Sequence, residues 1–202
     1  DTEATKEKRT ISTELVRQVG EEANMPFAVG GGIKNLDEIQ KIIAQGAEKV
    51  IINTCAVENP KFIREASDNF GSSTIVVCID VKKKFFSGNA VWSNSGSKSS
   101  KYSPKDFAKL IEENGAGEII IQSINKDGTM SGYDLDLIKE ISTTVTIPVV
   151  ALGGAGNLEH MIEAYKKGFA SALAAGSLFV FQGPKKGVLI NYIENSDLSF
   201  FR

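Results

Sequence analysis

The chain has 202 residues, of which 42% are hydrophobic and 24% are charged, and its formal net charge at pH 7 is −2. This is the composition of an ordinary globular protein with a sizeable core, and we expect one domain over residues 1–202. The small net charge argues against a nucleic-acid surface. No apolar run is long enough to cross a bilayer or to serve as a secretory signal. We therefore expect a cytoplasmic protein without nucleic-acid or membrane partners.

Short apolar runs alternate with helical patterns along the whole chain. The predicted strands are residues 26–30, 49–54, 74–80, 118–123, 148–153 and 170–176. Their continuous apolarity is typical of parallel strands that are covered on both faces. An amphipathic helix is predicted over 6–22, and later helices are expected to begin at Asn35, Asn59–Pro60, Ser103–Pro104, Asp134 and Asn157. This alternation predicts a barrel or an open doubly wound sheet.

One connection, residues 82–101, is too long and too polar for an ordinary link between a strand and a helix. We expect a small hairpin within it, around Gly88–Asn89. Long loops of this kind often cover a functional site, so the segment is either a lid or an insertion without a function.

The chain also repeats itself at an offset of 122 residues. The segment 26–36, PFAVGGGIKNL, recurs at 148–158 as PVVALGGAGNL without a gap. A duplicated unit of strand, double glycine and capped helix predicts a (β/α)8 barrel built from two similar halves.

In such a barrel, the functional site lies at the C-terminal ends of the strands. The repeat places two similar sets of small and polar residues there: Gly31 and Gly32 with Asn53 and Thr54, and Gly153 and Gly154 with Gly176 and Ser177. Glycines allow a phosphate to approach backbone N–H groups, so the two sets are candidate phosphate sites at opposite ends of one substrate. The alternative is that these glycines only permit tight turns.

Asp80 is the carboxylate at the end of an otherwise apolar predicted strand. Partial burial there would tune its pKa for general acid–base catalysis, although a simple hydrogen bond to a loop is the alternative. Ser123 ends the next predicted strand, and Asp127 follows it. Both are candidates for an acid–base or substrate contact. The only histidine, His160, is expected to cap a helix. The sequence has no metal-ligand cluster and no nucleotide-binding glycine motif, so we expect neither a metal nor a cofactor.

Several segments together resemble a known family. PFAVGGGI, KVIINTCAVENP, VVCIDVK, GAGEIIIQSINKDGTMSGYD and VVALGGAG are similar to the cyclase subunit of imidazole glycerol phosphate synthase, up to about Phe181. The resemblance implies a (β/α)8 barrel that receives ammonia from a partner glutaminase. It also implies that ammonia reacts with a bis-phosphorylated ribulosyl aminoimidazole intermediate. The products are imidazole glycerol phosphate and an aminoimidazole carboxamide ribotide.

The resemblance also implies roles for individual residues. Asp80 matches the family's catalytic aspartate. The residues that match phosphate sites are Gly32, Asn53 and Thr54 for one phosphate, and Gly128, Gly154 and Ser177 for the other. Lys49 and Glu118 match the charged gate where ammonia enters, and Glu48 lies at the end that faces the glutaminase.

The chain departs from the family pattern at some places. The first strand, first loop and second strand have no counterpart here, so we expect an N-terminally incomplete barrel. Asn125 stands where an aspartate is usual, and Leu152 where a serine is usual. The ending, with an extra residue near Gly176, is more similar to a paralogue that supports ammonia-dependent amidation of a surface-polysaccharide sugar. That function, or a non-catalytic subunit that docks a glutaminase and conducts ammonia, is the alternative.

Overall fold

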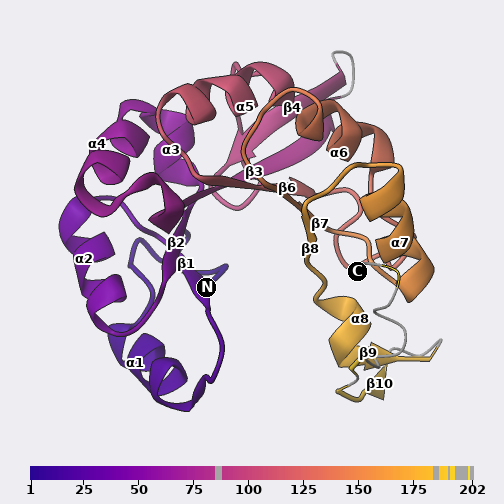
Figure 1. Cartoon of the computed structure of the whole chain (residues 1–202), viewed down its shortest axis with the longest axis horizontal. Helices are drawn as coiled ribbons and strands as arrows, with labels where there is room; N and C mark the ends of the chain where they lie inside the picture. The colour runs from indigo at the N-terminus through magenta and orange to yellow at the C-terminus, as the bar shows by residue number, and fades with distance from the viewer. Residues whose placement is uncertain (85–87, 184–186, 191, 194–199, 201–202) are drawn as a thin grey trace.

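The computed structural model describes residues 1–84, 88–183, 187–190, 192–193 and 200. Six parallel strands curve into an arc, and the helices lie along its outer side (Figure 1). In spatial order the strands are β1 (Ala28–Gly30), β2 (Lys49–Ile52), β3 (Ile75–Lys84), β6 (Glu118–Ser123), β7 (Val149–Leu152) and β8 (Ala172–Leu173). Within the described residues, β1 and β8 are the two ends of the arc. The fold is the curled parallel sheet of a (β/α) barrel, as the sequence predicts.

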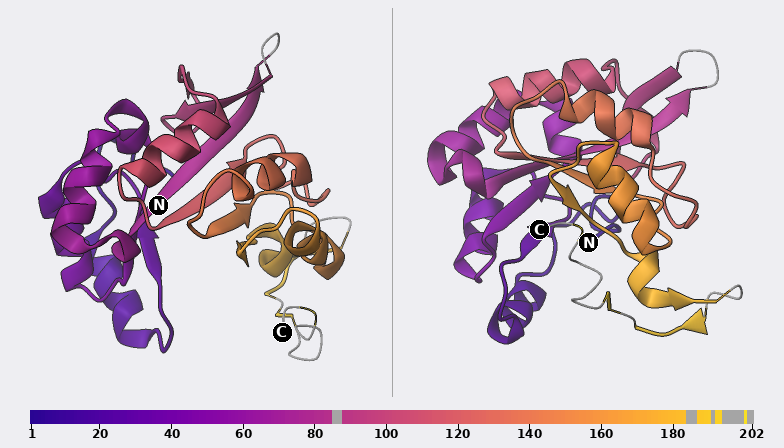
Figure 2. Two further views of the ribbon diagram at one scale, coloured as in Figure 1. Left: turned by 45° about the horizontal axis from the view of Figure 1, so that its top comes forward. Right: turned by 45° about the vertical axis from the view of Figure 1, so that its right-hand side comes forward.

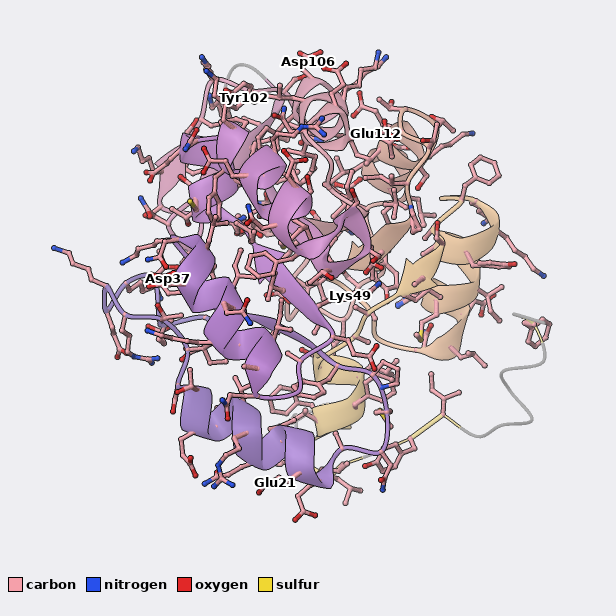
Figure 3. The ribbon with its side chains drawn as sticks, turned by 60° about the vertical axis from the view of Figure 1, so that its left-hand side comes forward. Glu21, Asp37, Lys49, Tyr102, Asp106 and Glu112 are labelled. Carbon is pink, nitrogen blue, oxygen red and sulfur yellow. The ribbon has the colours of Figure 1, made fainter. Side chains whose placement is uncertain are left out.

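The outer layer consists of the helices that connect these strands. They are α1 (Thr13–Glu22), α2 (Leu36–Ala44), α3 (Thr54–Glu58), α4 (Lys61–Phe70), α5 (Pro104–Glu113), α6 (Leu135–Ser142) and α7 (Leu158–Lys166), with a 3₁₀ turn, η1, at Ser72–Thr74. After β8 come the short helix α8 (Ser177–Val180) and an antiparallel pair, β9 (Phe181–Gln182) and β10 (Gly187–Val188). Charged side chains such as Glu21 and Asp37 point outward from the helices (Figure 3).

Most helix starts follow the predicted caps. The side chains of Asn35 and Asn157 accept the N–H groups of Glu38 and His160, each three residues into the chain that follows. Such caps satisfy backbone donors that the first turn of a helix leaves free. His160 therefore lies in a capped first turn, as predicted, and its Nδ1 accepts the N–H of Gly156.

The two faces of the sheet differ in burial, and this difference positions the site. Along β6, Ile119 and Ile121 face the helices and are buried, whereas Glu118, Ile120 and Gln122 alternate with them on the inner face and are half-buried. The core therefore lies between the sheet and the helices. The inner face presents Cys78 and Asp80 of β3 beside Ile120 and Gln122 of β6.

The predicted helix over residues 6–22 is wrong in its first part, because α1 begins at Thr13. The Ser12 side chain caps this helix by accepting the N–H of Leu15. Before it, the Asp1 carboxylate accepts the N–H groups of Glu3 and Ala4, which fixes a turn. Between this turn and α1, Lys8 has a left-handed φ of 56° and the N–H of Ile11 donates to the Gly31 carbonyl, so the backbone there is not helical.

Two strand predictions extend too far. The segment 49–54 ends as a strand at Ile52, because Thr54 already begins α3, and the segment 170–176 is a strand only at Ala172–Leu173. The predicted hairpin is present: β3 runs on past the sheet and pairs antiparallel with β4 (Gly88–Ser93), which pairs with β5 (Lys98–Ser99). Lys84 pairs with Gly88, so Gly88 and Asn89 belong to the returning strand, and the hairpin tip lies outside the described residues. The hairpin projects well beyond the other strands (Figure 2).

Candidate active site at the C-terminal edge of the sheet

Asp80 lies where β3 leaves the parallel sheet and enters the hairpin. Its neighbour on one side is Gln122 of β6, and its neighbour on the other side is Trp92 of β4. The Cys78 thiol, two residues earlier on the same face, donates to Asp80 Oδ1 at 3.5 Å. Both cysteines of the chain are free and half-buried.

The surroundings of Asp80 favour its neutral form. The pKa of its carboxyl is raised from 3.8 to about 6, mainly because burial disfavours the charged form. The negative charge of Asp127 contributes to this rise, while the hydrogen bond from Cys78 opposes it. A carboxyl group with a pKa near 6 exchanges protons readily at neutral pH, as general acid–base catalysis requires.

Gln122 lies beside Asp80 in the sheet, and its side chain forms a hydrogen bond with Asp127. Its amide nitrogen donates to Asp127 Oδ2 at 3.4 Å, and its amide oxygen lies 4.0 Å from the Cys78 sulfur. The sequence interpretation missed Gln122. The alternation of burial along β6 places it on the inner face, but only the strand register places it beside Asp80.

The second predicted phosphate site forms a small pocket. It is lined by Asp127, Gly128, Leu152, Gly153, Gly154, Ala155, Ala175, Gly176 and Ser177. Gly153 and Gly154 have φ values of 95° and 106°, and a Cβ on Gly154 would lie 2.2 Å from the carbonyl oxygen of Gly132. Only glycine fits there, because the backbones approach closely at a left-handed φ. The structure therefore brings all four predicted residues of this site together, with Asp127 beside them.

Ser123 does not join this pocket. It is 6% exposed and lies on the face of β6 that carries Ile119 and Ile121, opposite to Gln122. Its carbonyl oxygen accepts the N–H groups of Lys126 and Asp127, which shapes the loop that carries Asp127.

The residues of the first predicted phosphate site are engaged with the protein itself. Asn53 Nδ2 donates to the carbonyl of Cys78 at 2.9 Å, and Thr54 Oγ1 donates to Asn53 Oδ1 at 3.2 Å. Thr54 Oγ1 also accepts the N–H of Asn94 from the hairpin. Gly32 has a φ of 67°, and a Cβ there would lie 1.9 Å from the carbonyl oxygen of Arg9.

The opposite, N-terminal edge of the sheet carries the predicted gate. Lys49 at the start of β2 (labelled in Figure 3) makes an ion pair with Glu118 at the start of β6. The two strands are separated by β3, so the pair crosses in front of it on the inner face. Glu48, next to Lys49, is exposed, and its backbone N–H donates to Phe27.

Two departures from the family pattern also have positions near the site. The Asn125 side chain accepts the N–H of Lys83 at 3.3 Å, which ties the loop after β6 to the hairpin. Leu152 lines the glycine pocket.

Among the described residues, no group of three or more His, Cys, Asp or Glu side chains could hold a metal ion. No helix in the described part of the chain is long and apolar enough to span a membrane.

The parallel sheet curls as in a (β/α) barrel, and its C-terminal edge carries the half-buried carboxyl of Asp80 and a glycine-lined pocket. This arrangement is typical of enzymes with a (β/α) barrel fold. A model of the histidine biosynthesis protein family matches residues 1–183. The chain belongs to this family.

Individual relatives agree with this assignment. The imidazole glycerol phosphate synthase subunit HisF of Chlorobium phaeobacteroides is 44% identical over 185 residues, which cover 90% of this chain and 72% of the relative. The HisF subunit of Lachnoclostridium phytofermentans is 42% identical over 98% of this chain and 78% of the relative. A putative imidazole glycerol phosphate synthase subunit, hisF2, of Pseudomonas aeruginosa is 42% identical over 95% of this chain and 76% of the relative. The resemblance predicted from the sequence motifs is confirmed.

Proposed function

We propose that the chain is a cyclase-type subunit of imidazole glycerol phosphate synthase. It uses ammonia from a glutaminase partner to convert a bis-phosphorylated ribulosyl aminoimidazole intermediate into imidazole glycerol phosphate and aminoimidazole carboxamide ribotide. Each relative described above is named as a subunit of this synthase, so the comparisons do not favour the polysaccharide-linked or the non-catalytic alternative. The reaction needs only soluble reactants, and a cytoplasmic location is part of the same proposal.

The observation that carries the proposal is the position of Asp80. Its carboxyl, with a pKa of about 6, lies on the inner face beside Gln122, which reaches Asp127 at the rim of the glycine pocket. A substrate phosphate in that pocket would place the rest of the molecule over Asp80. The carboxyl is then in position to give a proton to, or take one from, the nitrogen atoms that react.

The pocket is suited to a phosphate because it offers backbone rather than bulky side chains. Gly128 and Gly176 leave open space where a Cβ would lie, and Ser177 adds a hydroxyl group. We assign one substrate phosphate to Gly128, Gly154, Gly176 and Ser177, and the other to Gly32, Asn53 and Thr54. Backbone N–H groups of such loops bind phosphate oxygens without the need for a cationic side chain.

The inner face also offers a route for ammonia from the N-terminal edge. Glu118, Ile120 and Gln122 follow one another on this face of β6. The path from the Lys49–Glu118 ion pair to the level of Asp80 is therefore four residues long, or roughly 13 Å. We propose that the glutaminase docks at the edge that carries Glu48, so that ammonia enters beside this ion pair.

The test is turnover with ammonium salts in place of the partner. The purified protein should convert the bis-phosphorylated intermediate into equal amounts of the two products. A matched control is Asp136→Asn, which removes a carboxylate from the exposed side of α6 and should leave the rate unchanged. A folded protein that forms no product would rule out the proposed function.

A further inference from the structure

The hairpin places an aromatic ring beside Asp80. Trp92 of β4 stands directly opposite Asp80 of β3 in the antiparallel pair. Residues that face each other in this way share one side of the sheet, with Cβ atoms about 5 Å apart. On the other side of the hairpin, Val81 and Val91 are buried, with exposures of 2% and 0%. Trp92 and Asp80 therefore occupy the half-open inner side, where a substrate would lie.

Lys82 fixes the position of this ring. The indole N–H of Trp92 donates to the Lys82 carbonyl at 3.1 Å, which holds the ring across β3. The Lys82 ammonium lies 5.0 Å from the ring centroid. Such a cation–π contact holds a positive charge close to the aromatic surface without a carboxylate partner. We call these two side chains the Trp92–Lys82 shelf.

The shelf is also tied to the loop that carries Asp127. Asn125 accepts the backbone N–H of Lys83, which is the residue after Lys82. The backbone N–H of Ile124 donates to Val81 on the same segment. The ring, Asp80 and the rim of the glycine pocket are therefore held by one hydrogen-bonded unit, so a ligand that contacts one part lies close to the others.

We propose that the Trp92–Lys82 shelf binds the planar heteroaromatic ring of a phosphorylated ribotide. The inference rests on the proposed function and names the part of the substrate that this surface recognises. Planar heteroaromatic rings stack on tryptophan, and the nearby ammonium adds a general attraction for an anionic ligand. The residues that line the glycine pocket include no aromatic side chain on which such a ring could stack.

The chain contains a single tryptophan, so its fluorescence reports on this position directly. The probe is aminoimidazole carboxamide ribotide, and the matched ligand without the heteroaromatic ring is ribose 5-phosphate. Titration with the ribotide should quench the tryptophan emission in a saturable way, whereas ribose 5-phosphate should bind without comparable quenching. Lys82→Met keeps the fluorophore and should weaken ribotide binding several-fold, with a smaller quench at saturation.

Ligand affinities measured by calorimetry test the role of the Trp92–Lys82 shelf separately from the proposed function. Trp92→Leu should weaken ribotide binding roughly tenfold and leave the affinity for ribose 5-phosphate unchanged. Trp92→Phe keeps an aromatic ring and should restore most of the affinity, which a purely structural role in the hairpin would not predict. Equal ribotide affinity of the wild type and a folded Trp92→Leu variant would overturn the shelf. If the wild type binds neither ligand, the proposed function fails, and the shelf fails with it.

Discussion

The two halves of the repeat carry matching glycines and polar residues, but the structure uses them differently. In the first half, the side chains of Asn53 and Thr54 bond to Cys78, to each other and to Asn94. In the second half, Gly128 and Gly176 leave space where a Cβ would lie, and they line a pocket with Ser177. A symmetric sequence pattern has therefore produced one site tied to the fold and one open site. Substitutions in the first half should change stability as well as ligand binding, whereas those in the second should change ligand binding alone.

The loss of Asp80 should have the largest effect. Asp80→Asn is expected to lower the ammonium-dependent kcat by a factor of roughly 10² to 10⁴, because the asparagine cannot exchange a proton. Phosphate-ester affinity, measured by calorimetry, should stay within about twofold. A variant that keeps more than a tenth of the wild-type rate would show that another group moves the proton.

The same substitution should stabilise the protein at neutral pH. Because the pKa of Asp80 is about 6 in the folded protein, the native state holds a proton that the unfolded chain releases near pH 4. The free energy of unfolding of the wild type therefore falls as the pH rises from about 4 to 6. Relative to it, Asp80→Asn should gain roughly 3 kcal/mol above pH 7 and little at pH 4. Urea denaturation at both pH values measures this, and an equal difference at both would contradict the raised pKa.

The open second half is best tested at Gly176, whose φ of −109° suits any residue. Gly176→Ala places a methyl group where no atom lies within 4 Å, so the fold should tolerate it. We expect phosphate-ester affinity to fall roughly tenfold and the free energy of unfolding to change by less than about 0.5 kcal/mol. Unchanged affinity would remove Gly176 from the phosphate site.

Substitutions in the first half should also lower stability. Asn53→Ala removes the donor to the Cys78 carbonyl, and we expect a loss of about 1–2 kcal/mol in the free energy of unfolding. Denaturant titration measures this loss. Asn59→Ala, at the other end of α3, is the control and should cost less, because the Asn59 side chain makes no hydrogen bond to the described part of the chain. A neutral Asn53→Ala would contradict the structural role of this half.

The helix caps are the part of the repeat that stays symmetric. Asn35→Ala and Asn157→Ala each remove one side-chain acceptor at the start of a helix, and each should cost about 1 kcal/mol. Thermal denaturation of the two variants should give similar losses. A difference of more than about 1 kcal/mol would show that the asymmetry extends beyond the site.

The sequence predicted those parts of the molecule that depend on local patterns. Continuous apolar runs identified all six parallel strands, and Asn35 and Asn157 were recognised as caps from their spacing alone. The family and the cyclase class followed from motifs and are confirmed by the comparisons. The role of each site residue stays a prediction.

Features that depend on register or long-range contacts could not be predicted. Gln122 meets the Cys78 sulfur and stands beside Asp80 only through the pairing of β3 with β6. The first part of a predicted helix is absent, because the N–H of Ile11 donates to the distant carbonyl of Gly31. The asymmetry of the two halves arises because Asn94 reaches Thr54 from a hairpin that the repeat does not contain.

The most direct test of this account is the pH dependence of kcat for the ammonium-dependent reaction. If the proton on Asp80 is essential, the kcat of the wild type should change with an apparent pKa near 6. The residual kcat of Asp80→Asn should lack this change. A wild-type enzyme that is folded and active, but whose kcat does not change between about pH 5 and 7, would contradict the role of Asp80 as the acid–base group.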